Sequence, residues 1–375
     1  MFFRQVIGHH DIKAKLIRSA EEDRISHAQL FLGKEGSGAL PLALAYACYL
    51  SCTGERNGDA CGTCPSCIKY QKLVHPDLHL VFPVIKPEGG KRAVSDMFVH
   101  QWREAVIANP YLELSQWYET INAENKQGSI FVDESDEIVR KLSLKTYESA
   151  YKIVIVWMAE KMNVQAANKL LKILEEPNPG TVFLLVSAST GTMLPTILSR
   201  LQVVKLPPIG QRDLQEALMA RHGLDEEKAG SIARMSDGNY LRALELMQTE
   251  TLSWELDKFA EFMRLCYKAD FPSILGWVEE LDRTGREKQK EFLLYCVRMI
   301  RENLMLNLEA TQLSRLTEEE KNFSVKFSRF IHTGNAGEIA AEFDKAMYHI
   351  ESNAYGKLVL LDLAIQTARL IKKEK

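Results

Sequence analysis

Four cysteines lie close together near the N-terminus of the chain, at a spacing that can hold a metal ion. They are Cys52, Cys61, Cys64 and Cys67. Each two-residue gap forms a tight loop that presents both of its sulfurs, so four thiolates can surround one tetrahedral zinc ion. Such a shell leaves no open position for substrate or water, so the spacing predicts a structural zinc site. An iron–sulfur cluster and unbound thiols are the alternatives, and the long polar first gap favours zinc.

The remaining cysteines are Cys48, Cys266 and Cys296, and each falls on the apolar face of a predicted helix. A free cysteine packs as a small apolar residue, so we expect these three in the core.

A glycine-rich loop follows the first predicted strand, Ala28–Leu32. Its glycines are Gly33, Gly36 and Gly38. The spacing from first to last matches a P-loop, whose backbone N–H groups cradle phosphate. A working P-loop continues with a Lys that reaches the phosphates and a Ser or Thr that binds Mg²⁺. Ala39 and Leu40 stand at those positions. The loop is therefore predicted to be vestigial, with weak phosphate binding through the backbone left open and an ordinary glycine turn as the alternative.

A second strand tests the same site. P-loop enzymes end this strand in an Asp that helps to hold Mg²⁺, but the run 152–156 ends in Trp157 and Met158. The nearest carboxylate, Glu160, lies beyond the strand end. Two separate losses thus indicate a nucleotide-type fold in which ATP is not hydrolysed and its binding is left open.

Arg200 follows Ser199 between two predicted strands. The fixed charge and planar fork of Arg can stabilise phosphoryl transfer at a neighbouring subunit. From this spacing alone, a solvated or paired surface Arg is the stronger interpretation.

Short apolar runs alternate with helical patterns in the first half of the chain, which is typical of a parallel sheet flanked by helices. The predicted strands are 28–32, 78–82, 152–157, 182–187 and 203–206, and the predicted helices are 11–22, 133–142 and 163–175. Pro207 and Pro208 then end the last strand. Three short helical patterns follow, at 211–222, 225–235 and 240–248, and after them come the long patterns 287–308 and 337–372. The segment 86–129 fits neither class and is interpreted as a partly helical insertion whose Trp and Tyr residues belong to local core.

Length and charge narrow the function. A chain of 375 residues is expected to form two or three domains. Its net charge of −3 argues against a stand-alone nucleic-acid binder. There is no long apolar run and no signal-like N-terminus, so a cytoplasmic protein is expected.

Several stretches resemble the bacterial clamp-loader family, the gamma/tau and delta-prime subunits of DNA polymerase III, over residues 1–250. The stretches are Val6–His9, Arg24–Gly33, the cysteine quartet, Ala167–Pro177 and Ser199–Leu201. Ala167–Pro177 is nearly identical to the family's Leu-Leu-Lys-Thr-Leu-Glu-Glu-Pro helix. Gly238–Leu244 is similar to the family's lid signature, with Arg242 one residue away from the usual sensor position.

The resemblance implies an architecture. It consists of an α/β P-loop (AAA+) domain 1–207 with a zinc module 52–67 and the insertion 86–129, a helical lid subdomain 208–250, and an all-α collar domain 251–375. In the family, the Arg of the Ser-Arg-Cys motif acts in trans on ATP bound by the adjacent subunit. The resemblance therefore assigns Arg200 and Ser199 to that motif, with Leu201 in place of its Cys. Delta-prime subunits commonly lack the P-loop Lys and the acidic pair, as this chain does.

The resemblance also implies partners. They are gamma/tau and delta subunits in a hetero-pentameric ring, with the sliding clamp and primed DNA met through that assembly. The chain is then no enzyme by itself but part of the DNA polymerase III holoenzyme, a nucleotidyltransferase complex. A gamma/tau-type ATPase is the alternative, and it requires a lysine at position 39 and acidic residues at 157 and 158. A zinc-dependent nucleic-acid-binding module is the other, which the near-neutral charge disfavours.

Overall fold

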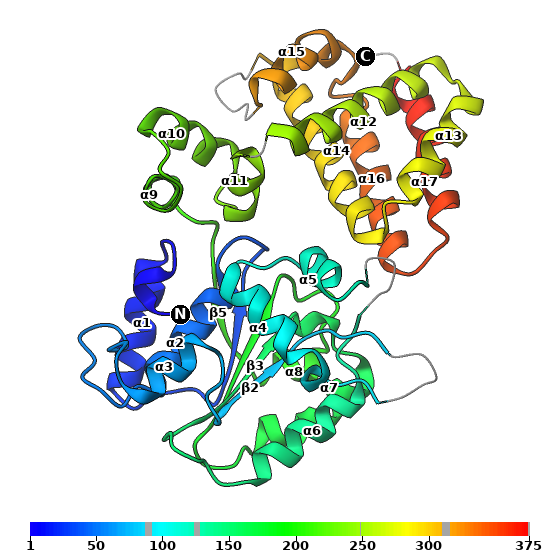
Figure 1. Ribbon diagram of the computed structural model, residues 1–375. Helices are drawn as coiled ribbons and strands as arrows, with labels where there is room; N and C mark the ends of the chain where they lie inside the picture. Colours follow the sequence, from blue (N-terminus) through cyan, green and yellow to red (C-terminus); the bar gives the residue numbers. More distant parts are fainter. Residues whose placement is uncertain (87–91, 124–127, 248, 310–315, 374–375) are drawn as a thin grey trace. The chain divides into compact units, whose positions relative to one another are not determined.

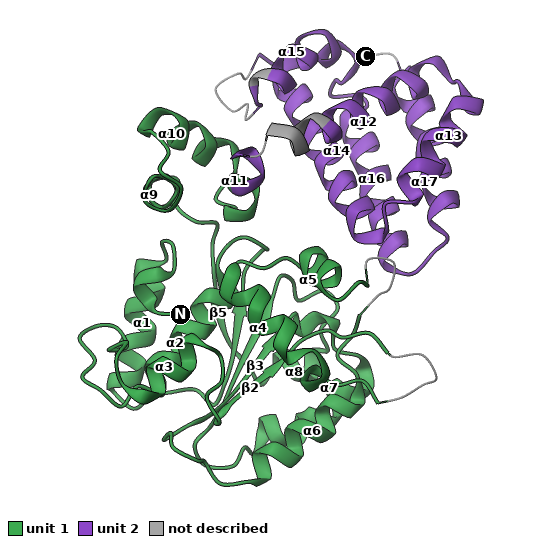
Figure 2. Cartoon of the chain, viewed as in Figure 1, with its two compact units in different colours: residues 1–243 green, residues 244–375 purple. Residues whose placement is uncertain are grey.

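The computed structural model describes residues 1–86, 92–123, 128–247, 249–309 and 316–373. The chain divides into two compact units, Met1–Ala243 and Leu244–Lys375 (Figure 2). Each unit has its own buried apolar core. The predicted boundaries at residues 207 and 250 stay predictions. In the part of the chain that the structure describes, no helix combines the length and apolar composition needed to cross a membrane.

A parallel sheet forms the centre of the first unit (Figure 1). Its strands are β1 (Ala28–Leu32), β2 (Leu78–Val81), β3 (Lys152–Trp157), β4 (Thr181–Ser187) and β5 (Gln202–Lys205), in the order β2-β3-β4-β1-β5. Every residue of β3 and β4 is buried, as expected for continuous apolar strands covered on both faces. The predicted strands are confirmed within one residue at each end, and so is the α/β P-loop class.

Helices cover both faces of this sheet. They are α1 (His10–Glu21), α2 (Ala39–Leu50), α3 (Pro65–Gln71), α4 (Val99–Ala108), α5 (Leu114–Thr120), α6 (Val132–Ser143), α7 (Val164–Glu175) and α8 (Pro195–Leu198). All residues of α2 are buried, because this helix packs in one core with Phe31, Ile155 and Leu184. The other face packs with α6 and α7 in a separate cluster.

The insertion 86–129 contains α4 and α5, so it is partly helical as predicted. Its aromatic residues are core: Trp102 and Trp117 are fully buried. Trp102 stacks on Phe82 at a ring distance of 4.9 Å, and Trp117 Nε1 donates to the Pro83 carbonyl at 2.8 Å. Gly89, Gly90 and Lys91 of this insertion lie outside the described residues.

Three short helices follow β5: α9 (Gln211–His222), α10 (Glu226–Met235) and α11 (Tyr240–Met247). Gly223 ends α9 in the left-handed conformation, with φ of 67°, which glycine adopts without the steric cost of a Cβ. We call α9 to α11 the lid helices.

The second unit is helical throughout its described residues. Its helices are α12 (Thr249–Lys268), α13 (Phe271–Asp282), α14 (Arg286–Asn307), α15 (Glu318–Phe327), α16 (Ala336–Glu351) and α17 (Gly356–Leu370). The long helical pattern over 337–372 corresponds to two helices, because the chain turns between α16 and α17. Asn353 adopts φ of 65° there, and Ala354 N donates back to the His349 carbonyl at 2.9 Å. The apolar period continues across the turn because both helices bury residues in the same core.

Candidate functional sites

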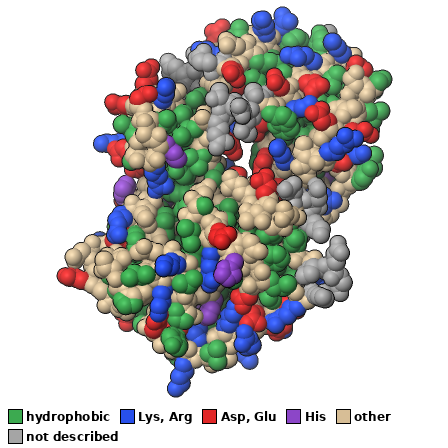
Figure 3. All heavy atoms as spheres, viewed as in Figure 1, with side chains coloured by type: hydrophobic (Ala, Val, Ile, Leu, Met, Phe, Trp, Pro, Cys, Tyr) green, Lys and Arg blue, Asp and Glu red, His purple; other side chains and the backbone are tan. Residues whose placement is uncertain are grey.

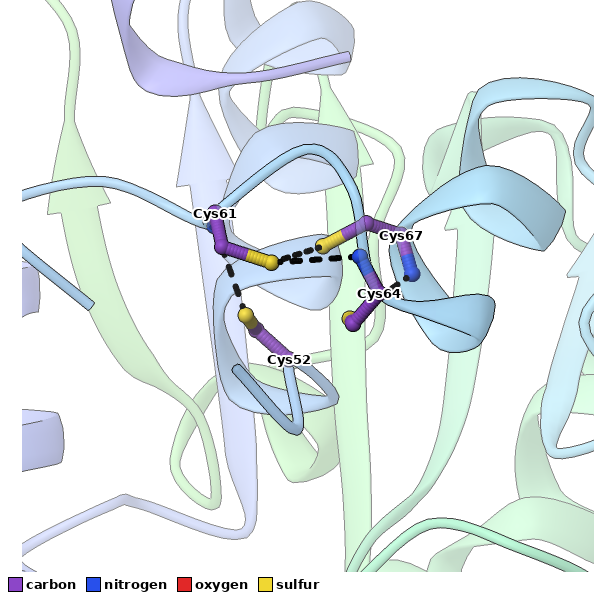
Figure 4. Close-up of side chains that lie close together, drawn as sticks. All are labelled: Cys52, Cys61, Cys64 and Cys67. Atoms are coloured by element: carbon purple, nitrogen blue, oxygen red, sulfur yellow. Dashed lines mark hydrogen bonds between the residues drawn. The ribbon is translucent and has the colours of Figure 1, made fainter. Parts of the chain in front are cut away.

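The four predicted cysteine ligands come together at one point (Figure 4). Their sulfur atoms all lie within 4.8 Å of one another, and the sulfurs of Cys61 and Cys67 are 3.9 Å apart. Four thiolates about 2.3 Å from one tetrahedral zinc ion are about 3.8 Å from each other. The donor set and its spacing therefore fit a single structural zinc ion. In a four-iron cluster each cysteine binds a different iron atom, which requires a wider arrangement.

Backbone N–H groups support this shell. Those of Cys61, Cys64 and Cys67 each donate to the sulfur of the preceding cysteine, at 3.4, 3.3 and 3.4 Å. Hydrogen bonds of this kind favour the charged thiolate that zinc requires. Gly54 is needed beside them, because a Cβ at this position would lie 2.6 Å from the Cys61 sulfur.

The cysteine loop, residues 52–67, also holds the start of the chain. The carboxylate of Asp59 accepts from the backbone N–H groups of Phe3 and Arg4, both at 3.0 Å. The Arg4 guanidinium lies 3.3 Å from the same carboxylate. Folding of the cysteine loop is thereby coupled to the N-terminal segment, which packs on α2 through the ring contact of Phe3 with Tyr49.

A fifth cysteine lies beside the shell. Cys48, predicted as core, is fully buried in α2, and its sulfur is 3.9 Å from that of Cys67. Burial raises the pKa of the Cys48 thiol to about 12. Cys266 and Cys296 are fully buried in the second unit, as predicted.

The glycine loop lies between β1 and α2, as its sequence predicts. Gly36 and Gly38 have φ of 73° and 93°, a region that side chains with a Cβ rarely adopt. Ala39 and Leu40 are buried at the start of α2. They offer neither the positive charge nor the hydroxyl that a nucleotide and its metal ion need at these positions.

The cavity at this loop is small. Its volume is about 30 Å³, enough for a water molecule or two, whereas small-molecule sites measure roughly 300–1,000 Å³. Its lining includes Leu40, Trp157 and Met158, and also Tyr111 from the insertion. Large apolar side chains thus take up part of the space beside the loop, whose lining also includes Lys34 and Glu35.

Glu160 lies beyond the end of β3, in the short 3-10 turn Ala159–Lys161. Its Oε1 accepts from Ala188 N at 2.9 Å, so the carboxyl links the end of β3 to the end of β4. Burial raises the pKa of Glu160. One oxygen of this carboxyl is therefore engaged by the Ala188 N–H.

Arg200 lies at the amino-terminal ends of the strands, whereas the glycine loop lies at their carboxyl-terminal ends. β1 and β5 are parallel, with Gln29 opposite Gln202 and Leu32 opposite Lys205. Arg200 precedes β5, whereas the glycine loop follows β1. Because one residue lies before the strand start and the other after the strand end, Arg200 is separated by the strand length from its own chain's loop.

The guanidinium of Arg200 is partly exposed and held by its own unit. Its Nε donates to Glu175 Oε1 at 2.6 Å, and its Nη2 is ion-paired with the same carboxylate. Its Nη1 donates to the Thr196 carbonyl at 2.6 Å and to Ser199 Oγ at 3.3 Å. The paired surface Arg that the spacing favoured is thus present, in a fixed orientation.

Sequence reasoning missed three residues at these sites. Glu175 holds Arg200, and Tyr111 and Asn239 lie against the glycine loop. Glu175 lies in the stretch 167–177 and Asn239 in the stretch 238–244, both of which resemble the family, but Tyr111 carries no motif. Burial raises the pKa of Tyr111 to about 12, so the phenol is neutral at physiological pH.

Charged side chains are interspersed on the surface. Figure 3 shows Lys and Arg side chains mixed with Asp and Glu over the face drawn, so this face is neither wholly basic nor wholly acidic. This agrees with the net charge of −3.

Comparisons with known proteins point to one family. Residues 8–210 match the family described as DNA polymerase III, delta subunit. The DNA polymerase III subunit delta′ of Bacillus subtilis (strain 168) is 30% identical over 246 residues, which are 66% of this chain and 59% of that protein. The gamma/tau subunit of Mycobacterium tuberculosis (strain ATCC 25618 / H37Rv) is 24% identical over 225 residues, 59% of this chain and 32% of that protein.

Among solved structures, a DNA polymerase III gamma subunit-related protein from Thermotoga maritima aligns over 95% of this chain and 99% of its own, with 17% identity and a TM-score of 0.38. The family match covers the sheet, the cysteine quartet, the glycine loop and Arg200. The chain belongs to the DNA polymerase III delta subunit family, with delta′ and gamma/tau subunits among its relatives.

Proposed function

We propose that this chain is a delta-prime-type subunit of the DNA polymerase III clamp loader that hydrolyses no ATP itself. In this proposal it joins gamma/tau and delta subunits in a cytoplasmic ring of five. It stimulates ATP hydrolysis at the neighbouring subunit while the assembly loads the sliding clamp onto primed DNA. The second unit is the collar through which the ring forms, and the zinc module is structural.

One observation carries the proposal of an inactive site: the cavity at the glycine loop measures about 30 Å³, and Leu40, Trp157 and Met158 are among the residues that line it. Hydrolysis needs a cation at the phosphates and a metal ligand nearby. Ala39 stands in place of the cation, and Met158 offers a soft thioether that hard Mg²⁺ does not select.

The position of Arg200 supports action in trans. It lies at the opposite end of the strands from its own glycine loop. A phosphate that it contacts must therefore belong to another subunit. Its side chain is one-third exposed and therefore accessible to such a partner.

ATP hydrolysis by the purified chain, alone and after mixing with gamma/tau, delta, clamp and primed DNA, tests this proposal. No turnover is expected from the chain alone, and turnover is expected in the mixture. Robust hydrolysis by the chain alone would favour the gamma/tau-type ATPase and would contradict the interpretation of Ala39 and Met158.

A further inference from the structure

Tyr111 of the insertion is only 3% exposed and lies against the glycine loop. Its ring covers Gly38, where a Cβ would lie 3.2 Å from Tyr111 Cε1. Its hydroxyl accepts from the Ile7 N–H at 2.9 Å. The Asn109 side chain accepts from Tyr111 N at 3.0 Å and fixes the turn that presents the ring. Tyr111 thus joins the loop to the N-terminal segment.

The lid helices meet the same place from the other side. The rings of Tyr111 and Tyr240 lie 4.7 Å apart. Tyr240 N donates to the Gly36 carbonyl at 3.0 Å. The Asn239 carboxamide lies so close to Gly36 that a Cβ there would be 1.8 Å from its Oδ1. The start of α11 is therefore seated directly on the loop.

Two further contacts close the lid helices on the N-terminal segment. Arg221 Nη2 donates to the Gln5 carbonyl, and His10 Nε2 lies 3.1 Å from Asp213 Oδ1. Contacts from α9 and α11 thus converge on the N-terminal segment and the glycine loop.

We propose that Tyr111, with Asn239 and Tyr240, takes the place of a nucleotide in this chain. Lids of binding proteins commonly close because a ligand contacts both sides of the cleft. Here a side chain of the insertion makes the contacts that a ligand on the glycine loop would make: to the loop, to the N-terminal segment and to the lid helices. The insertion is thus an internal ligand that keeps the lid closed without ATP. The inference deepens the proposed inactive site but is independent of any role of Arg200.

Hydrogen exchange of the full-length chain tests this inference, with and without Mg²⁺-ATP, in the wild type and three variants. Tyr111→Ala removes the ring, and Tyr111→Phe removes only the hydroxyl. Tyr118→Ala is the matched control, because Tyr118 is a buried aromatic of the same insertion whose hydroxyl donates to the Gly128 carbonyl, away from the loop.

In the wild type, exchange of lid peptides 211–243 is expected to be unchanged by Mg²⁺-ATP. In Tyr111→Ala these peptides should exchange at least about tenfold faster, because loss of a closing contact raises the population of the open state. Tyr118→Ala should leave their exchange within about twofold of the wild type. Tyr111→Phe should accelerate exchange of the Ile7 amide while the lid peptides change little.

Two results would overturn the inference. One is protection of the wild-type lid by Mg²⁺-ATP, which would mean that nucleotide is the closing ligand. The other is a folded Tyr111→Ala chain with wild-type lid exchange. If Tyr111→Ala does not fold, Tyr111→Phe decides, because an unchanged Ile7 amide would remove the proposed link. Failure of Arg200 to act in trans would change none of these exchange rates.

Discussion

The carboxylate of Glu175 fixes the orientation of Arg200. It accepts from the Nε side of the guanidinium, while the Thr196 carbonyl accepts from Nη1 at 2.6 Å. A side chain as long as Arg loses substantial rotamer entropy when it must be positioned for one contact. Under the proposed function, Glu175 meets that cost within the chain before the neighbouring subunit binds.

Glu175→Ala is therefore expected to lower ATP turnover of the assembled complex about fivefold, which corresponds to about 1 kcal/mol for a partly exposed pair. The KM for ATP should stay unchanged, because Arg200 would act on the transition state. Steady-state kinetics of the reconstituted assembly measure both. Glu176→Ala is the control, because Glu176 is an exposed neighbour of Glu175, whereas Arg200 is bonded to Glu175. If Glu175→Ala and Glu176→Ala gave the same turnover, Glu175 would have no role in positioning Arg200.

Glu134 predicts a pH dependence of stability. It is buried in α6 and accepts from Ser95 N in the insertion. Burial raises its pKa from an ordinary 4.5 to about 7. The folded state then binds a proton that the unfolded state has lost between these values, so stability falls as pH rises from about 4.5 through 7. The full effect is about 3 kcal/mol at most.

Glu134→Gln keeps the acceptor for Ser95 N and removes the titration. Its melting temperature should exceed that of the wild type at pH 8.5, and the difference should shrink towards pH 5. Thermal unfolding across this range measures it. Asp136→Asn on the same helix serves as control, because Asp136 is half-exposed. A difference that does not vary with pH would show that burial of the Glu134 charge is not the cause.

The cysteine loop, residues 52–67, is the element whose chemistry is simplest to test. Purified protein is expected to contain one zinc ion per chain. Cys61→Ser should lose it and lower the melting temperature of the first unit by about 10 °C, because metal binding free energy contributes to folding. Cys48→Ala should retain the zinc, although its sulfur is 3.9 Å from that of Cys67. Metal analysis and calorimetry decide. Loss of zinc in Cys48→Ala would add a fifth participant to the site.

Elements set by local pattern were predictable from the sequence, and elements set by distant contacts were not. The run Ile153–Val156 is apolar at every position, so a buried strand follows from the pattern alone. The apolar period runs on across the turn at Asn353, so the sequence pattern does not reveal that turn. It is seen only in the left-handed backbone of Asn353. Tyr111 lies 104 residues from its partner Ile7, and no local signal announces such a pairing.

The candidate sites divide in the same way. Cysteine spacing specifies all four ligands because the ion needs them within one short segment. Ala39 and Met158 are readable as losses because the positions that they occupy are fixed by the loop and strand. The closing of the space by Tyr111 depends on how the insertion folds back, which spacing does not encode.

For the whole chain, separate cores predict separate unfolding. The apolar core of the second unit is distinct from the two clusters of the first. A fragment that begins at Thr249 is therefore expected to fold by itself into a helical domain with a cooperative thermal transition. Circular dichroism of this fragment measures it. A fragment without a cooperative transition would mean that the second unit needs the first.

Under the proposed function, the chain hydrolyses no ATP yet supplies Arg200 to the neighbouring subunit. The most direct measurement is ATP turnover by gamma/tau, delta, clamp and primed DNA mixed with the wild type, Arg200→Ala or the control Arg212→Ala, whose side chain is 91% exposed. The wild type and both variants should assemble equally by gel filtration. Arg200→Ala is expected to lose about tenfold or more of the turnover at the site it serves, while Arg212→Ala behaves as wild type. Wild-type turnover with an assembled Arg200→Ala chain would contradict the claim.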